Sequence, residues 1–238
     1  MPPEVSFAYG LNFYKLFWVF TIGCFIGVVI ETFWCLLLYR KLESRKGLVW
    51  GPFNLVYGFG ALVMTLGLYP LRESRDLFIF AVGTILGGVF EYICSVVQEK
   101  VVGTVSWDYR NFPLNLNGRI NLLYCFFWGI LALLWVKDLF PRLTWLIKQI
   151  PNEIGIPLTW FGVVFFIIDS IHSALVVYRM NERQGGNAET NRFWNFFDRH
   201  YPDEKVRKIY PNMKFNLKSQ NEQEDTLGKI IFRNNPEN

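Results

Sequence analysis

The sequence predicts an all-α, polytopic membrane protein, a transmembrane helix bundle of about five spans with a parallel internal repeat of two helical hairpins. Apolar residues make up 52% of the 238 residues, which is high for a soluble chain. Apolar runs of about 20 residues, the length needed to cross a bilayer, recur along the sequence. Two short motifs also occur twice in the same order, once in each predicted hairpin. These observations exclude an ordinary soluble domain.

Charged residues are nearly absent from the predicted spans. Between Lys15 and Arg40 only Glu31 is charged, and the third and fifth spans each contain one acid, Glu91 and Asp169. An amphipathic stretch at about 138–150 is predicted to lie as a helix in the membrane interface. The transmembrane bundle therefore occupies residues 1–178, with spans at about 13–39, 48–71, 77–97, 119–136 and 154–178.

Basic residues in the first loop predict the orientation of the chain. Only Lys15 precedes the first span, whereas four basic residues follow it: Arg40, Lys41, Arg45 and Lys46. Because Lys and Arg accumulate in cytoplasmic loops, we expect this loop in the cytoplasm. Five spans then place the N-terminus outside and the C-terminus in the cytoplasm.

The composition changes after residue 178, where we expect a cytoplasmic tail, residues 179–238. Its first part alternates Arg with Phe and Trp, a mixture typical of an amphipathic helix on an anionic membrane surface or against the bundle. From about residue 216 the content of Asn, Gln, Glu and Lys predicts disorder.

The first repeated motif places two glycines and a glutamate at intervals of four residues. It occurs as Gly23, Gly27 and Glu31 and again as Gly83, Gly87 and Glu91. Residues four apart share one helix face, so another helix can approach closely at the glycines. Packing alone could account for the glycines.

The two glutamates need a further explanation, because an ionisable side chain inside a span costs several kcal/mol and is kept for a partner or a use. Glu31 and Glu91 both lie about 10 to 14 Å inside the predicted cytoplasmic boundary, at about 1.5 Å per residue. We therefore expect both carboxyl groups to face one common polar chamber. If they approach within about 5 Å without a cation, one of them should keep its proton at neutral pH.

The second repeated motif carries amide and phenol side chains into the even-numbered spans. Asn54 and Tyr57 recur at the same spacing as Asn121 and Tyr124. The amides could bind a carboxylate or a ligand head group, and the tyrosines lie one turn deeper. A role in hydrogen bonding between helices is an equal alternative for the asparagines.

The loop between the third and fourth spans is rich in residues that bind ligands. Arg45 of the first loop and five residues of this loop complete the set of candidate binding residues. The five are Trp107, Asp108, Tyr109, Asn117 and Arg119. The aromatic residues could also be members of an interfacial belt. An ion pair of Arg119 or Arg45 with Glu31, Glu91 or Asp108 is a second alternative.

Together these residues resemble the CmpB-like type IV ABC-transporter permease family of small bacterial membrane proteins. The resemblance covers about residues 13–180 and rests on Glu31, Gly51-Pro52, Asn54, Tyr57-Gly58, Glu91-Tyr92, Trp107-Asp108-Tyr109, Asn115-Leu116-Asn117-Gly118-Arg119 and Trp128-Gly129. It implies a permease-like protein of the cell (plasma) membrane and assigns no catalytic or binding residues.

The function predicted from these features is the handling of an unidentified solute or ion through a polar site in the cytoplasmic half of the bundle. The chain has no GxxxxGK[ST] phosphate-binding loop, so coupling to ATP would require a cytoplasmic ATPase subunit. Proton coupling through the glutamate pair is the mechanism expected without ATP. Membrane lipid and a second copy of the chain are further expected partners, and we expect no nucleic acid, metal or cofactor.

Two alternatives remain open from the sequence. A membrane-embedded enzyme could act on a lipid or polyprenyl head group at the cytoplasmic interface, although no strong pair of nucleophile and base is present. A scaffold or sensor could recruit a cytoplasmic partner through the C-terminal tail.

Overall fold

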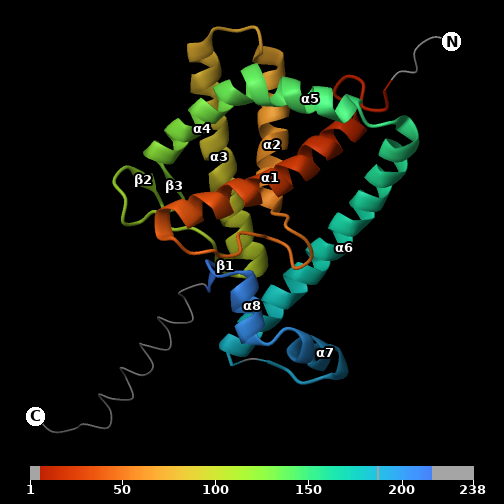
Figure 1. Ribbon diagram of the computed structural model, residues 1–238. Helices are drawn as coiled ribbons and strands as arrows, with labels where there is room; N and C mark the ends of the chain where they lie inside the picture. The colour runs from red at the N-terminus through yellow and green to blue at the C-terminus, as the bar shows by residue number, and fades with distance from the viewer. Residues whose placement is uncertain (1–5, 187, 216–238) are drawn as a thin grey trace, which may run out of the picture.

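The computed structural model describes residues 6–186 and 188–215, and these residues form mainly α-helices (Figure 1). The all-α class predicted from the sequence is therefore confirmed. The disorder predicted from about residue 216 lies outside the described residues.

The first hairpin consists of α1 (Phe13–Tyr39) and α2 (Leu55–Leu68), which continues into the short 3₁₀ helix η1 (Tyr69–Leu71). The span predicted to start at residue 48 becomes helical only at Leu55. Gly51 has a φ of +72°, which a helix does not accept, and the Asn54 side chain then caps α2 by accepting a hydrogen bond from the Val56 amide at 3.1 Å. Residues 48–54 are consequently part of the loop.

The second hairpin consists of α3 (Asp76–Val102) and α4 (Leu122–Leu134). Helix α4 continues through a π-helical turn, η2 (Trp135–Leu139), into α5 (Phe140–Lys148), so that the three form one bent helix across the top of Figure 1. Pro141 lacks the amide hydrogen that would bond to the preceding turn, which fits a break at this place. The predicted interfacial helix is thus continuous with the fourth span.

Short strands order the loop between α3 and α4. Strands β2 (Asn115–Leu116) and β3 (Ile120–Asn121) pair as an antiparallel hairpin. The other pair joins distant parts of the chain, because β1 (Thr104–Val105), just after α3, is antiparallel to β4 (Lys214–Phe215) near the end of the described residues.

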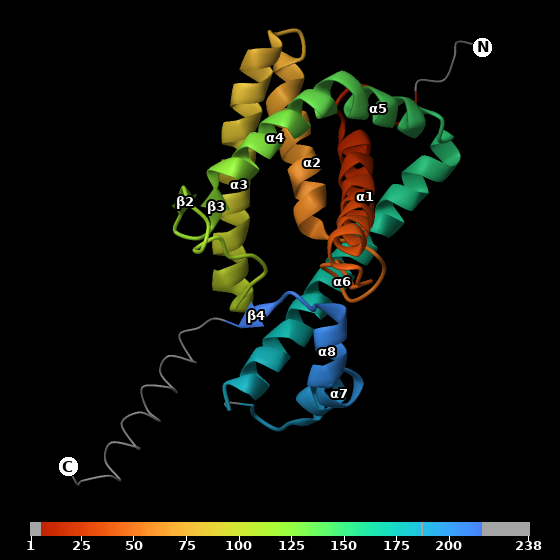
Figure 2. The same ribbon diagram turned by 60° about the vertical axis from the view of Figure 1, so that its left-hand side comes forward.

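The long helix α6 (Asn152–Gln184) runs diagonally along the molecule and extends beyond the other helices (Figure 2). Two tail helices, α7 (Arg192–His200) and α8 (Asp203–Ile209), pack against its far end. Their shared core contains Val176, Val177, Met180, Phe197 and Val206.

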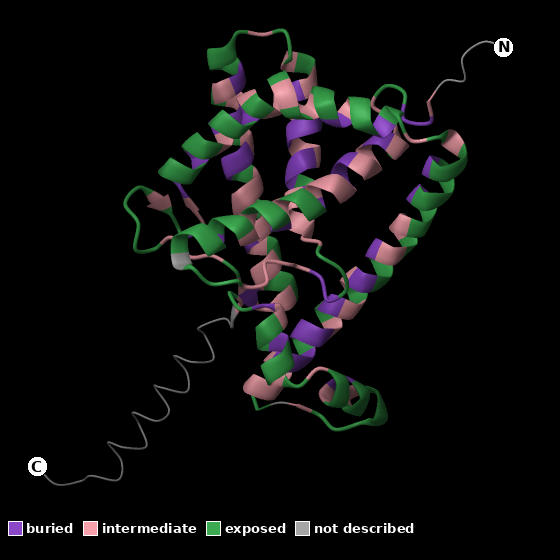
Figure 3. Ribbon diagram, viewed as in Figure 1, coloured by how far each residue is buried: buried purple, intermediate pink, exposed green. Residues whose placement is uncertain are grey.

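Among the described residues, four helical segments are long and apolar enough to cross a membrane: Phe13–Leu38, Asp76–Val102, Leu122–Lys148 and Asn152–Gln184. Helix α2 with η1 is apolar but shorter, so the count of five spans stays a prediction. Between 17 and 22% of the residues in the apolar windows of these segments are buried, and exposed residues line the outer sides of the helices (Figure 3). Such outward-facing apolar surface is expected for a protein whose solvent is lipid.

Candidate functional site

The helices of the first hairpin meet at the glycines of the first motif. A Cβ on Gly23 would lie 2.8 Å from the Cβ of Ala61, and a Cβ on Gly27 would lie 2.4 Å from the Cβ of Tyr57. Only a residue without a side chain allows this separation of α1 and α2. The close approach brings Glu31, one turn further along α1, next to α2.

The helices of the second hairpin meet in the same way. A Cβ on Gly83 would lie 2.1 Å from the Cβ of Ala132, and a Cβ on Gly87 would lie 2.2 Å from Cγ of Trp128. In both hairpins the first glycine faces an alanine and the second faces an aromatic residue four positions before that alanine. The common origin of the hairpins stays a prediction from the sequence.

Glu31 is held by a phenol and faces an arginine. The Tyr57 hydroxyl donates a short hydrogen bond to Oε2 of Glu31, and Nη1 of Arg45 lies 3.8 Å from Oε1. The Arg45 side chain is only 9% exposed, and its Nε is buried without a hydrogen-bond partner among the described residues. Asn54 holds the loop in place, since its Nδ2 donates to the Arg45 carbonyl at 3.2 Å. These contacts agree with the ion-pair alternative for Arg45.

Glu91 is held by two neutral donors. The Tyr109 hydroxyl donates to Oε1 at 2.8 Å, and Nε1 of Trp128 donates to Oε2 at 3.0 Å. Tyr124 stacks on the Tyr109 ring with the ring centres 4.7 Å apart, which fixes the orientation of the phenol. Burial, followed by the nearby Glu91 charge, raises the pKa of Tyr109 in the loop, so this residue keeps its proton and remains a donor.

The residue that takes the place of Tyr57 in the second hairpin is Trp128, which sequence matching did not identify. Asn54 and Asn121 are both helix caps, as their matched positions suggest. However, Tyr57 lies three residues after its cap, whereas Trp128 lies seven residues after Asn121, one helical turn deeper. Tyr124, the partner expected from the spacing, instead supports Tyr109. The available signal was the dipeptide Tyr57-Gly58, which has its equivalent in Trp128-Gly129.

The remaining candidates in the second loop do not reach either glutamate through the described contacts. Arg119 forms a close ion pair with Glu99 and donates to Oγ of Ser95 at 2.9 Å. The other three have separate partners. Trp107 donates to the Arg119 carbonyl at 3.0 Å, and Asn117 donates to the Tyr92 hydroxyl at 3.0 Å. Asp108 forms an ion pair with Arg110 at 2.6 Å. Arg119, through Ser95 and Glu99, and Asn117, through Tyr92, thus tie the loop to α3.

The structure therefore gathers the candidates into two groups rather than one. The contacts of Glu31 lie within α1, α2 and the first loop, and those of Glu91 lie within α3, α4 and the second loop. The two hairpins join through α2 and α3, and α2 lies between α1 and α3 in Figure 2. Trp128 links the groups, because a Cβ on Gly60 of α2 would lie 3.5 Å from its Cη2. The common chamber stays a prediction.

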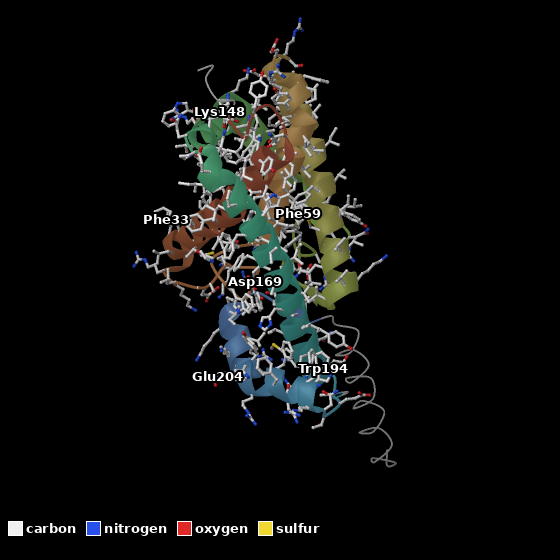
Figure 4. All side chains as sticks on the ribbon, turned by 90° about the vertical axis from the view of Figure 1, so that its right-hand side faces the viewer. Phe33, Phe59, Lys148, Asp169, Trp194 and Glu204 are labelled. Carbon is white, nitrogen blue, oxygen red and sulfur yellow. The ribbon has the colours of Figure 1, made fainter. Side chains whose placement is uncertain are left out.

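A third polar cluster fixes the first loop to α6 around Asp169, which is labelled in Figure 4. Its buried carboxylate accepts hydrogen bonds from the Trp50 amide and from Oγ of Ser173, both at 3.1 Å. His172, one turn further, stacks on Trp50 and shares a 2.9 Å hydrogen bond with the hydroxyl of Tyr201 in the tail. Sequence spacing could not identify these contacts, because the main partner of Asp169 is a backbone amide.

The tail helices are anchored to α6 by a network of arginines and aspartates. Arg179, only 4% exposed, forms a bidentate pair with Asp198, with its Nη2 2.6 Å from Oδ2. Arg183 contacts both Asp198 and Asp203 at 2.5 Å. The hydrogen bonds from Arg179, then those from Arg183, lower the pKa of Asp198 to about 2. Helices α7 and α8 are therefore fixed to α6, at the end of the molecule that the sequence predicts to be cytoplasmic.

Within the described ranges, no cluster of three or more His, Cys, Asp or Glu side chains could hold a metal ion. The polar groups considered for a ligand are instead the carboxylates of the two glutamates and the side chains that hydrogen-bond to them.

The chain matches the sequence model of a protein family. The sequence model of the family described as "Putative ABC-transporter type IV" matches residues 18–174, more than half of the chain. The matched region includes both hairpins, both glutamates and the part of α6 that carries Asp169. Comparison with curated proteins and with solved structures gives no match.

Proposed function

Since the chain belongs to the family described as "Putative ABC-transporter type IV", we propose that it is a permease-like membrane protein that handles a polar solute or ion through Glu31 and Glu91. The observation that carries the proposal is the Glu91 site. A carboxylate within an apolar helix is held there by Tyr109 and Trp128, two neutral donors, so its charge is available to a proton or a cationic ligand.

The Glu31 site supports the same function with a different balance of charge. Arg45 lies beside the carboxylate, at 3.8 Å, a distance too long for a direct hydrogen bond. A ligand that binds Glu31 would therefore compete with an arginine whose shorter ion pair, at 3.4 Å, is with Glu43 of the same loop. Binding there would shift this loop, which is fixed at its other end to Asp169 of α6.

Coupling to an energy source takes one of two forms in this proposal. In the ABC form a separate ATPase subunit docks on the cytoplasmic face, where the first loop and the tail helices α7 and α8 lie together on α6. In the second form, protons exchanged at the glutamates drive transport. A dimer of the chain could complete the pathway in either form.

Because the solute is unidentified, the protein is tested with a mixture of small molecules. Proteoliposomes containing the full chain are incubated with a small-molecule extract of cells, and the compounds that enter the lumen are identified by mass spectrometry. The wild-type protein is expected to accumulate a defined set that the Glu31→Gln/Glu91→Gln double variant does not. The matched control is Glu73→Gln, since the Glu73 side chain is 86% exposed and lies outside the helices. Equal accumulation by the double variant would contradict the proposal.

The ATPase form has its own test. The chain is extracted with its surrounding membrane by an amphipathic polymer, and the proteins that copurify are identified by mass spectrometry. We expect a subunit with a phosphate-binding loop, retained by the full chain and lost on truncation after Met180. Its absence from repeated preparations would favour proton coupling.

A further inference from the structure

A second site lies at the opposite end of the bundle from α7, between the end of α2 and the bend that joins α4 to α5. We propose that this site binds an anionic phospholipid, with the part of one acyl chain nearest the head group inside the site and the phosphate next to Arg72. The proposal is independent of the two glutamates and of the transported solute.

A cavity of about 180 Å³ is present at this place. Its walls are apolar, with Met64 and Leu68 on α2 and Trp135, Val136 and Phe140 on the bent helix. For comparison, an apolar cavity of about 150 Å³ in another protein binds benzene. The volume therefore accommodates a segment of a hydrocarbon chain but no whole lipid.

The π-helical turn creates the cavity. Helix α4 and α5 would run straight on without it, whereas the turn at Trp135–Leu139 directs α5 across the end of α2. The Tyr69 and Phe140 rings meet edge to face there, 6.1 Å apart, and Nε1 of Trp135 donates to Oγ1 of Thr65 at 3.1 Å. These contacts fix the walls of the cavity relative to each other, and π-helical turns are frequent at functional sites.

Two polar groups distinguish the cavity from a packing defect. Thr144 lines it, and its Oγ1 is buried without a hydrogen-bond partner among the described residues. A buried hydroxyl in that state is unfavourable, and an ester oxygen of a lipid would accept its hydrogen bond. Arg72 also lines it, with 49% of its side chain exposed. Its guanidinium donates to the Tyr69 carbonyl and lies 3.4 Å from the exposed Glu73 carboxylate, a surface pair that a phosphate at the opening would replace.

The position in the molecule identifies the occupant as lipid. Charged pairs next to the cavity, Lys137 with Asp76 and Arg142 with Asp138, indicate the level at which the bundle meets the head groups. Beyond this level the helices carry many exposed apolar side chains, so the medium at the cavity is hydrocarbon. A chain entering from the adjacent leaflet would place its phosphate at the height of Arg72.

The test compares phosphatidylglycerol and phosphatidylcholine with identical chains, added to the delipidated full-length protein and measured by native mass spectrometry. We expect phosphatidylglycerol to be retained about fivefold better, the equivalent of about one basic residue beside a head group of net negative charge, because the choline cation neutralises the phosphate of phosphatidylcholine. Thr144→Trp should fill the cavity and remove this retained lipid. Leu146→Trp is the matched control on the same helix, because Leu146 is 54% exposed and does not line the cavity.

Two further measurements keep the test decisive if Thr144→Trp fails to fold. Arg72→Gln should abolish the preference for phosphatidylglycerol, whereas Arg142→Gln, at a side chain 76% exposed, should keep it. Phosphatidylglycerol with a photoreactive group on the part of an acyl chain nearest the head group should label peptides that contain residues 64–72 and 135–144. Equal retention of the two lipids, or labelling spread over the other helices, would overturn the proposal.

Discussion

Replacement of Gly87 by alanine tests whether close helix packing positions the Glu91 site. The added Cβ would lie 2.2 Å from Cγ of Trp128 and 2.5 Å from its Cβ. Rotation of the tryptophan side chain cannot move its own Cβ, so α3 and α4 must separate. The indole hydrogen bond to Glu91 depends on that separation and should be lost as well.

The expected magnitude follows from these contacts. Overpacking of this kind costs about 1–3 kcal/mol, and a hydrogen bond to a charged group contributes about 1.5–3 kcal/mol. Alanine regains about 1 kcal/mol through its higher helix propensity. Gly60→Ala has the same gain and is the matched control, because its new Cβ would meet the edge of Phe90 at 3.3 Å and Cη2 of Trp128 at 3.5 Å, both far longer than the 2.2 Å contact at Gly87. Because this gain cancels between the two variants, we expect Gly87→Ala to be less stable than Gly60→Ala by at least about 2.5 kcal/mol, about seventyfold in the unfolding equilibrium.

The assay is reversible unfolding in mixed micelles with increasing sodium dodecyl sulfate, followed by circular dichroism. A second readout is the indole N–H resonance of Trp128, which should lose the shift caused by its carboxylate partner. If both variants unfold at the same detergent fraction and the resonance does not change, the glycine does not set the helix separation.

Three further predictions concern the tail and the second loop. Because the pKa of Asp198 is lowered, its pairing with Arg179 stabilises the docked α7 fully above the ordinary pKa of about 4, and this stabilisation is lost as the pH falls towards about 2. Energy transfer between fluorescent labels on α6 and α7 should therefore decrease over that pH range. A constant signal would contradict this prediction. Asp198→Asn should increase protease cleavage between α6 and α7 at neutral pH, whereas Glu204→Gln, at an 84% exposed side chain, should leave the wild-type rate. Tyr109→Phe removes one of the two donors to Glu91 and should slow solute uptake in proteoliposomes about tenfold, the effect of about 1.4 kcal/mol; an unchanged rate would show that this donor is dispensable.

Much of the helical architecture could be predicted from apolar length alone. Helix α1 has the predicted bounds of its span, because a long apolar run with Glu31 as its one acid leaves the chain one favourable structure in lipid. The start of α2 was predicted too early, since hydropathy does not register that Gly51 adopts a positive φ and that Asn54 caps the helix. The family resemblance was confirmed by the match to residues 18–174.

The candidate site was predicted less completely, because its contacts depend on how the helices cross. Glu31 and Glu91 could be singled out from the cost of a charge in lipid. Their partners could not: the choice of Trp128 over Tyr124 depends on one additional helical turn between the Asn121 cap and the crossing point. The partners of Asp169 escape a search by residue type for a related reason, since a backbone amide has no sequence signature.

The measurement that tests the central claim most directly is the initial uptake rate of the accumulated solute by Glu31→Gln and Glu91→Gln separately, with equal amounts of folded protein in the liposomes. The expected result is that each variant loses uptake while Glu73→Gln transports at the wild-type rate. If both variants transport as fast as the wild-type protein, the carboxylates do not handle the solute and their role is confined to helix packing.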